Sequence, residues 1–207
     1  MVIKVKGQNV AAPFVCGHLW AGGAVGPTPA DVMVIGKHPG PEEVAMRRNF
    51  QSPSCADLRR ALEELQVPDE ETDRWYVTNL VKFMPPDEST TLKASWVADC
   101  LPLLAQELRI VRPKFILCLG ADACRYLLKA VSRLGRLSDG MKKFSVGYLE
   151  GRTIKFEYYI GDDDDSDTWQ PAKVVVTAHP AAVVHDDSAK RQLQRGITRF
   201  GFVTSGK

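Results

Sequence analysis

The sequence DVMVIGKHPG occupies residues 31–40 and places a glycine- and proline-rich turn directly after a short apolar run. The run is rich in β-branched residues and nearly continuous, which is typical of a parallel strand buried on both faces. Three later runs have the same character, at residues 75–80, 114–119 and 173–177. We expect these four runs to form a parallel sheet with the turn at its carboxyl edge.

Helical patterns separate the four expected strands. Leucines recur at helical spacing from about residue 54 to residue 66, and further helical stretches cover about residues 93–110, 121–134 and 187–200. This alternation predicts an α/β fold, namely a three-layer α/β/α sandwich with a central four-stranded parallel sheet. In such folds the loops that follow the carboxyl ends of the strands carry the ligand site.

An insertion precedes the fourth expected strand. Residues 143–149 and 153–159 flank a Glu-Gly-Arg turn, a pattern that predicts a β-hairpin, and an acidic segment follows them. We assign residues 143–170 to this hairpin and acidic-loop insertion. Residues 1–30 form an N-terminal extension, with a short strand expected at residues 2–5.

The composition fits one intracellular domain that spans residues 1–207. Hydrophobic residues make up 44% of the chain, which is enough for one packed core. No apolar run approaches the roughly 18 to 20 residues that a membrane span needs. The five cysteines form no C-x-x-C pair, so we expect reduced thiols and a cytoplasmic, soluble protein without membrane contact.

The formal net charge of +2 hides an uneven distribution. Residues 150–170 hold seven acidic and two basic side chains, so the rest of the chain carries a net charge of +7. A modestly basic body permits binding to a phosphate backbone, although an ordinary solvated surface has the same composition. The acidic loop at residues 162–167 either lies away from such a ligand, which we favour, or recruits a basic protein partner.

Polar residues follow three of the expected strands. The first turn carries Lys37 and His38, and the second strand ends near Asn79, whose amide can both donate to and accept from the edge of a pyrimidine. His179 follows the fourth strand and is held by Pro180, where an imidazole can stabilise developing negative charge. Each residue also has a structural explanation, as part of a tight turn, as a backbone cap or as a structural histidine.

Two further segments carry basic or aromatic side chains. Phe50 lies beside Arg47 and Arg48 in a loop, where its ring either stacks on a nucleobase or packs locally. The last helix carries Arg191 and Arg195, which either contact a phosphate backbone or form a solvated face.

The order and spacing of these blocks resemble the uracil-DNA glycosylase superfamily, most closely its iron–sulfur class. The resemblance covers roughly residues 30–200 and is carried by residues 36–62, 75–86, 100–128 and 174–184. It implies a parallel sheet flanked by helices, with an extrahelical uracil held at the strand ends.

The resemblance also implies roles for individual residues. Phe50 would stack on the base, Asn79 would read the uracil edge, and His179 would stabilise the departing uracil anion. Backbone groups from Gly36 to Gly40 would line the rest of the pocket. The residues expected to face DNA are Arg47, Arg48, Lys82, Arg191 and Arg195.

The first motif departs from the family pattern, because Lys37 stands where the iron–sulfur class has Glu and His38 stands where other classes have Asp or Asn. Three alternatives follow. Lys37 contacts a DNA phosphate while neutral His38 positions the attacking water, which we favour; Lys37 is a nucleophile that forms a Schiff base; or the site has lost catalysis.

The cluster ligands of the iron–sulfur class are also incomplete. Cys100 matches one ligand and Cys16 could match another, but Phe83 occupies a third ligand position. Two cysteines cannot hold a four-cysteine cluster. We therefore expect no iron–sulfur cluster and no other cofactor, with apolar packing by Phe83 in its place.

The resemblance supports two functional hypotheses. The first is a monofunctional DNA glycosylase that flips out uracil or a related modified pyrimidine, excises it and leaves an abasic site. The alternative is a catalytically inactive glycosylase-fold module that binds DNA or a protein. In both cases we expect a monomer whose partner is single- or double-stranded DNA.

Overall fold

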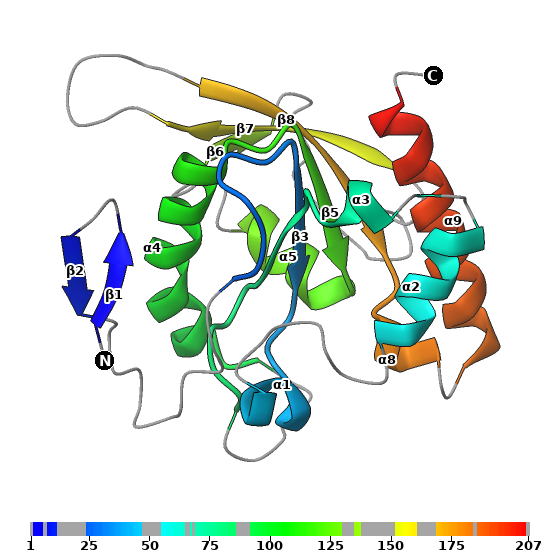
Figure 1. Ribbon diagram of the computed structural model, residues 1–207, viewed down its shortest axis with the longest axis horizontal. Helices are drawn as coiled ribbons and strands as arrows, with labels where there is room; N and C mark the ends of the chain where they lie inside the picture. The colour runs from blue at the N-terminus through cyan, green and yellow to red at the C-terminus, as the bar shows by residue number, and fades with distance from the viewer. Residues whose placement is uncertain are drawn as a thin grey trace.

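The computed structural model describes residues 2–5, 8–11, 24–46, 55–64, 67, 69–85, 92–129, 135–137, 152–160, 169–183 and 186–205. Within them a six-stranded sheet has the order β4-β3-β5-β8-β7-β6 (Figure 1). The strands of this sheet are β3 (Val32–Gly36), β4 (Tyr76–Asn79), β5 (Phe115–Leu119), β6 (Gly135–Leu137), β7 (Thr153–Tyr159) and β8 (Trp169–Thr177).

Four neighbouring strands of the sheet, β4, β3, β5 and β8, are parallel. They confirm the predicted four-stranded parallel sheet. Every residue of β3 is buried, and its alternate side chains belong to two different cores, Met33 and Ile35 to one and Val32 and Val34 to the other. A strand buried on both faces explains why its sequence is apolar without interruption.

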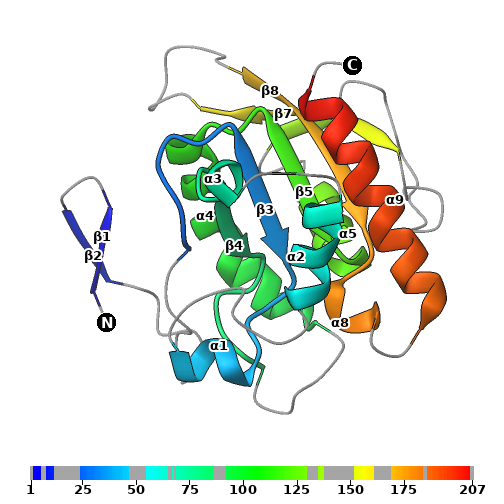
Figure 2. The ribbon, with the colours of Figure 1, turned by 45° about the vertical axis from the view of Figure 1, so that its right-hand side comes forward.

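Helices cover both faces of this sheet, as Figure 2 shows. Side chains of α4 (Ala94–Val111) and α5 (Ala121–Lys129) pack in the core that contains Met33, and side chains of α2 (Cys55–Glu64) and α9 (Asp187–Thr204) pack in the core that contains Val34. The predicted three-layer sandwich is therefore confirmed. The described residues also include three short helices, α1 (Pro41–Met46), α3 (Asp69–Thr72) and α8 (Pro180–Val183).

The insertion differs in part from its prediction. Residues 153–159 do form a strand, and its alternating burial places Ile154, Phe156 and Tyr158 in the core, as expected for an antiparallel strand with one buried face. Its described partners are β8 and β6. The predicted partner, residues 143–149, and the acidic loop at 162–167 lie outside the described residues.

The eighth strand is longer than predicted. It begins at Trp169; residues 169–175 pair antiparallel with β7, and residues 173–177 pair parallel with β5. At the N-terminus, the strand predicted at residues 2–5 is confirmed as β1 (Val2–Val5), which pairs antiparallel with β2 (Gln8–Ala11). Among the described residues, no helix combines the length and apolar character that crossing a membrane requires.

Candidate active site at the carboxyl edge of the sheet

The carboxyl ends of β3, β4 and β8 bring three of the predicted site segments to one edge of the sheet. Gly36 and Asn79 are register partners at the ends of β3 and β4. The backbone N–H of Leu80 donates to the Gly36 carbonyl at 2.9 Å. The segment after Asn79 is thus tied to the turn after β3, while Asn79 itself is only 3% exposed.

The turn after β5 joins this edge to His179. Gly120 has a φ of +88°, a backbone conformation that favours glycine, and its N–H donates to the Thr177 carbonyl at 2.8 Å. A Cβ added to Gly120 would lie 3.1 Å from the Cβ of His179. The β5–α5 turn therefore packs directly against the backbone and side chain that carry the predicted anion-stabilising imidazole.

Lys37 forms an ion pair with Asp122, a residue that the sequence analysis did not single out. The Lys37 Nζ lies 3.0 Å from Asp122 Oδ2, and the two side chains are only 18% and 27% exposed. Asp122 lies in the first turn of α5, just after the carboxyl end of a predicted strand. This position in the sequence could have marked it as a candidate site residue. The helix dipole favours a carboxylate in that turn.

This ion pair bears on two of the alternatives for Lys37. A Schiff base requires the Lys37 nitrogen to attack the sugar, whereas this nitrogen lies 3.0 Å from the Asp122 carboxylate. The Lys37 ammonium, which was expected to contact a DNA phosphate, is already paired with Asp122 at 3.0 Å. The structure therefore supports neither a nucleophilic nor a phosphate-binding Lys37.

His179 and His38 lie in surroundings that disfavour their charged forms. Burial, followed by the nearby His38 and Lys37, lowers the pKa of His179 to about 4. Burial is also the largest cause of the lowered pKa of His38, and Lys37 adds to the lowering while Asp122 opposes it. Both imidazoles are therefore neutral near pH 7, and each can donate through one ring nitrogen and accept through the other.

The tautomer of His38 follows from its neighbour. His38 Nδ1 lies 3.0 Å from the Pro39 carbonyl, which can only accept, so Nδ1 carries the proton. In the neutral ring this leaves Nε2 as a hydrogen-bond acceptor. An acceptor of this kind is what is needed to orient a water molecule, as the sequence analysis expected of His38.

The turn after β3 is held in place by Glu43, which is buried at 6% exposure. Its Oε2 accepts from the Gly40 N–H at 2.8 Å, three residues earlier, at the start of α1. This is one half of a capping box. It anchors the backbone at Gly40, the last residue of the segment from Gly36 to Gly40 that is expected to line the pocket wall.

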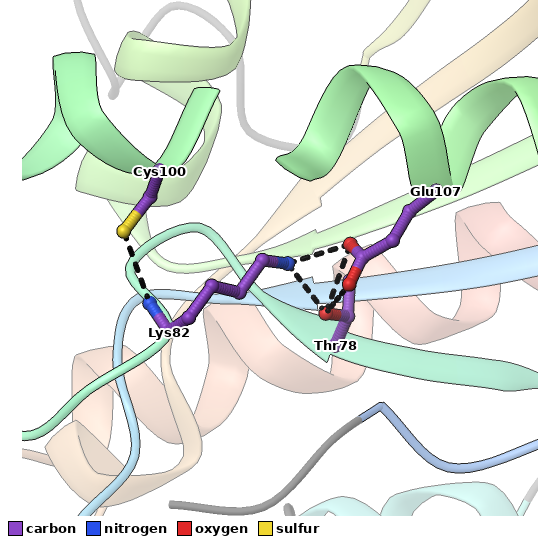
Figure 3. Close-up of polar contacts among 4 residues, drawn as sticks. All are labelled: Thr78, Lys82, Cys100 and Glu107. Carbon is purple, nitrogen blue, oxygen red and sulfur yellow. Dashed lines mark hydrogen bonds and ion pairs between the residues drawn. The ribbon is translucent and has the colours of Figure 1, made fainter. Parts of the chain in front are cut away.

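Lys82 does not lie where the sequence analysis expected it. Its Nζ donates to Glu107 Oε2 at 2.5 Å and to Thr78 Oγ1 at 2.8 Å, and its side chain is 7% exposed (Figure 3). Glu107 belongs to α4, so the ammonium lies between β4 and that helix. The expectation that Lys82 contacts DNA is therefore wrong, because a paired and buried ammonium cannot reach a phosphate backbone.

The residues around Cys100 do not form a cluster site in the described part of the chain. The backbone N–H of Lys82 donates to the Cys100 Sγ at 3.4 Å (Figure 3). The Phe83 ring packs edge-on against the Trp96 ring, with their centroids 5.9 Å apart. No group of three or more His, Cys, Asp or Glu side chains among the described residues could hold a metal ion. Phe83 is 3% exposed, which agrees with the apolar packing expected of it.

The other predicted residues have less structural support. Arg191 and Arg195 lie on the exposed side of α9, whose opposite side packs in the core. Arg47, Arg48, Phe50 and Cys16 lie outside the described residues. Base stacking by Phe50 and DNA contacts by the arginines remain predictions.

Comparison with known proteins adds relatives of both sequence and fold. The family model described as "UDG: Uracil DNA glycosylase superfamily" matches residues 24–197. A type-4 uracil-DNA glycosylase of Pyrobaculum aerophilum is 27% identical over 170 residues, which cover 82% of this chain and 76% of the relative. A second type-4 uracil-DNA glycosylase, from Saccharolobus solfataricus, is 26% identical over 184 residues, with coverages of 88% and 75%.

A solved structure resembles the chain as well. The crystal structure of Pedobacter heparinus SMUG2 matches with a TM-score of 0.51 at 10% identity, and the match covers 86% of this chain and 76% of that one. At this level of identity the likeness bears on the fold alone.

Proposed function

The chain belongs to the uracil-DNA glycosylase superfamily, and from this premise we propose that it excises uracil, or a related modified pyrimidine, from DNA and leaves an abasic site. The observation that carries the proposal is a neutral His179 at the carboxyl edge of the sheet, at the edge where the turn from Gly36 to Gly40 and Asn79 also lie. The names of the two type-4 relatives supply the substrate class.

Base recognition is assigned to the buried edge of the sheet. The target nucleotide leaves the stack, because a base inside a duplex cannot enter a protein pocket. The Asn79 amide reads the edge of the base, the backbone from Gly36 to Gly40 lines the wall, and Phe50 stacks on the ring. Asn79 suits this role because it is buried, so that a base which does not match its amide would leave buried polar groups unpaired at a cost.

Catalysis is assigned to the two histidines. As the bond between C1′ and the base breaks, its electron pair remains on the base, and a neutral His179 donates a hydrogen bond to the resulting anion. Water oriented by His38 Nε2 adds its oxygen to the electron-poor C1′ and gives up a proton to that nitrogen. The base anion then takes a proton from solvent and His38 Nε2 returns its proton to solvent, which completes a hydrolysis that needs no cofactor.

DNA contacts are assigned to the arginines that remain after Lys82 is removed from the set, namely Arg47, Arg48, Arg191 and Arg195. These side chains neutralise phosphates without reading sequence. In this proposal the chain acts as a monomer without an iron–sulfur cluster, in keeping with the environment of Phe83 and Cys100. The acidic segment at residues 162–167 plays no part in DNA binding.

The proposal is tested with labelled oligonucleotides that carry uracil opposite guanine, uracil opposite adenine or uracil in a single strand, with thymine and cytosine as control bases. Abasic sites are revealed by alkaline cleavage. We expect cleavage of at least one uracil substrate and about 100-fold slower cleavage by Asn79→Leu. DNA binding without abasic sites in any uracil substrate would instead favour the inactive binding module.

A further inference from the structure

The first motif of this chain raises a problem of charge. The resemblance to the iron–sulfur class implies an acid at the position where this chain carries Lys37. In the proposed reaction the sugar of the substrate becomes positive as the base departs. An unpaired ammonium at this point would oppose that charge, since like charges repel most strongly where solvent is excluded.

The structure places a carboxylate on that ammonium from another element. Asp122 Oδ2 lies 3.0 Å from Lys37 Nζ, while Asp122 Oδ1 lies 3.6 Å from the more exposed Arg125. Asp122 is fixed by the first turn of α5, and the preceding turn packs on His179. The compensating charge therefore comes from the same turn that supports the candidate anion-stabilising residue.

We propose that Asp122 is a positioning residue that cancels the charge of Lys37 at the candidate active site and holds its ammonium away from the reacting sugar. In effect, the acid absent from the first motif is supplied by α5. This inference rests on the proposed function, because it concerns the charge that develops during base excision.

The neighbouring imidazoles support this assignment. Lys37 acts on both His38 and His179 in the direction of a lower pKa, whereas Asp122 acts on His38 in the opposite direction. The fields of both partners thus reach the residue proposed to orient water. Removal of Asp122 would leave the field of Lys37 uncompensated at His38.

The first test measures single-turnover uracil release by Asp122→Asn, Lys37→Met and the double variant. We expect Asp122→Asn to lower the rate by about 10- to 100-fold, and the double variant to recover at least about 10-fold of that loss. Lys37→Met alone should lose less than Asp122→Asn. A double variant no faster than Asp122→Asn would overturn the proposal, since Asp122 would then act independently of Lys37.

A matched control exists at the opposite edge of the sheet. Lys114 and Asp31 also form a Lys–Asp pair at 3.0 Å, with side chains 60% and 67% exposed. Asp31→Asn should leave the release rate within about twofold of the wild type, because a solvated pair has little influence at a distance. Equal losses in Asp31→Asn and Asp122→Asn would mean a general effect of charge and would contradict the proposal.

A second test does not depend on activity. NMR titration of His38, whose titratable neighbours are Lys37, Asp122 and His179, should give a lower pKa in Asp122→Asn and a higher pKa in Lys37→Met than in the wild type. If the wild type released no base, the proposed function would fail. The titration would still test whether Asp122 compensates the charge of Lys37 at His38. A His38 titration that neither variant shifts would overturn the proposal.

Discussion

Two lysine–carboxylate pairs join strand ends to helices on the same face of the sheet, and they differ in what surrounds them. Lys82 and Glu107 are 7% and 17% exposed and share their contacts with Thr78. Lys37 and Asp122 are more exposed, and their neighbours are two imidazoles with lowered pKa values. We therefore assign the Lys82–Glu107 pair to the stability of the fold, and the Lys37–Asp122 pair, in the proposal above, to the candidate active site.

The largest expected effect on stability comes from breaking the Lys82–Glu107 pair. Glu107→Ala leaves the Lys82 ammonium buried without its carboxylate, which should reduce the free energy of unfolding by about 3 to 5 kcal/mol. Urea denaturation followed by circular dichroism measures this loss. Lys82→Met in the same background should recover most of it, and a loss below about 1 kcal/mol would mean that the pair is not a structural element.

A smaller effect on stability is expected from a substitution at Gly120, where the β5–α5 turn packs against His179. Gly120→Ala forces a side chain into a positive-φ position and brings its Cβ 3.1 Å from His179, at a cost of about 1 to 2 kcal/mol. Uracil release should slow by about 10-fold, because small displacements of a catalytic group are costly. Full activity in Gly120→Ala would show that His179 does not need this contact.

The Lys37–Asp122 pair should contribute least to stability. Asp122→Asn should change the free energy of unfolding by less than about 1 kcal/mol, because the pair is partly solvated. The same variant should nevertheless slow uracil release, as inferred above. A stability loss as large as that of Glu107→Ala would abolish the distinction between the two pairs.

The pH dependence of uracil release tests the environment of His179. Because the pKa of His179 is lowered to about 4, the neutral donor persists from pH 8 down to about pH 5 and is lost below that. The rate of uracil release should show no inflection from His179 near its usual pKa of 6.5. An inflection near pH 6.5 that disappears in His179→Gln would contradict the assignment of a buried, neutral donor.

The same lowered pKa has a consequence for stability. The unfolded chain takes up a proton at the ordinary histidine pKa of 6.5, above the folded-state value, so folding is favoured fully above pH 6.5 and is weakened as the pH falls toward 4. Urea midpoints measured between pH 7 and pH 4.5 should decline less in His179→Gln than in the wild type. Identical declines would contradict the buried environment of His179.

The two pairs also show what sequence could and could not predict. The parallel strands were predictable because burial on both faces leaves an uninterrupted apolar run, as in β3, and β7 was predicted from the Glu-Gly-Arg turn before it. The strand-end positions of Lys37, Asn79 and His179 followed from the topology of the sheet. Their likeness to family motifs supplied the expected roles.

The partners of the two lysines were not predictable in the same way. Asp122 and Glu107 reach Lys37 and Lys82 across 85 and 25 positions of sequence, and no local pattern marks either pairing. The expected DNA contact of Lys82 was wrong because the sequence does not reveal whether a lysine is buried with a carboxylate. The first half of β8 was missed because its pairing with β7 is set by tertiary structure.

The central claim is that the candidate active site excises uracil with His179 as the donor to the departing base. The most direct measurement is mass-spectrometric detection of free uracil under single-turnover conditions at pH 7, with the wild type and His179→Ala compared at equal fractions folded. We expect free uracil from the wild type and a rate at least about 100-fold lower in His179→Ala. No free uracil from the wild type, or equal rates in the two proteins, would contradict this account.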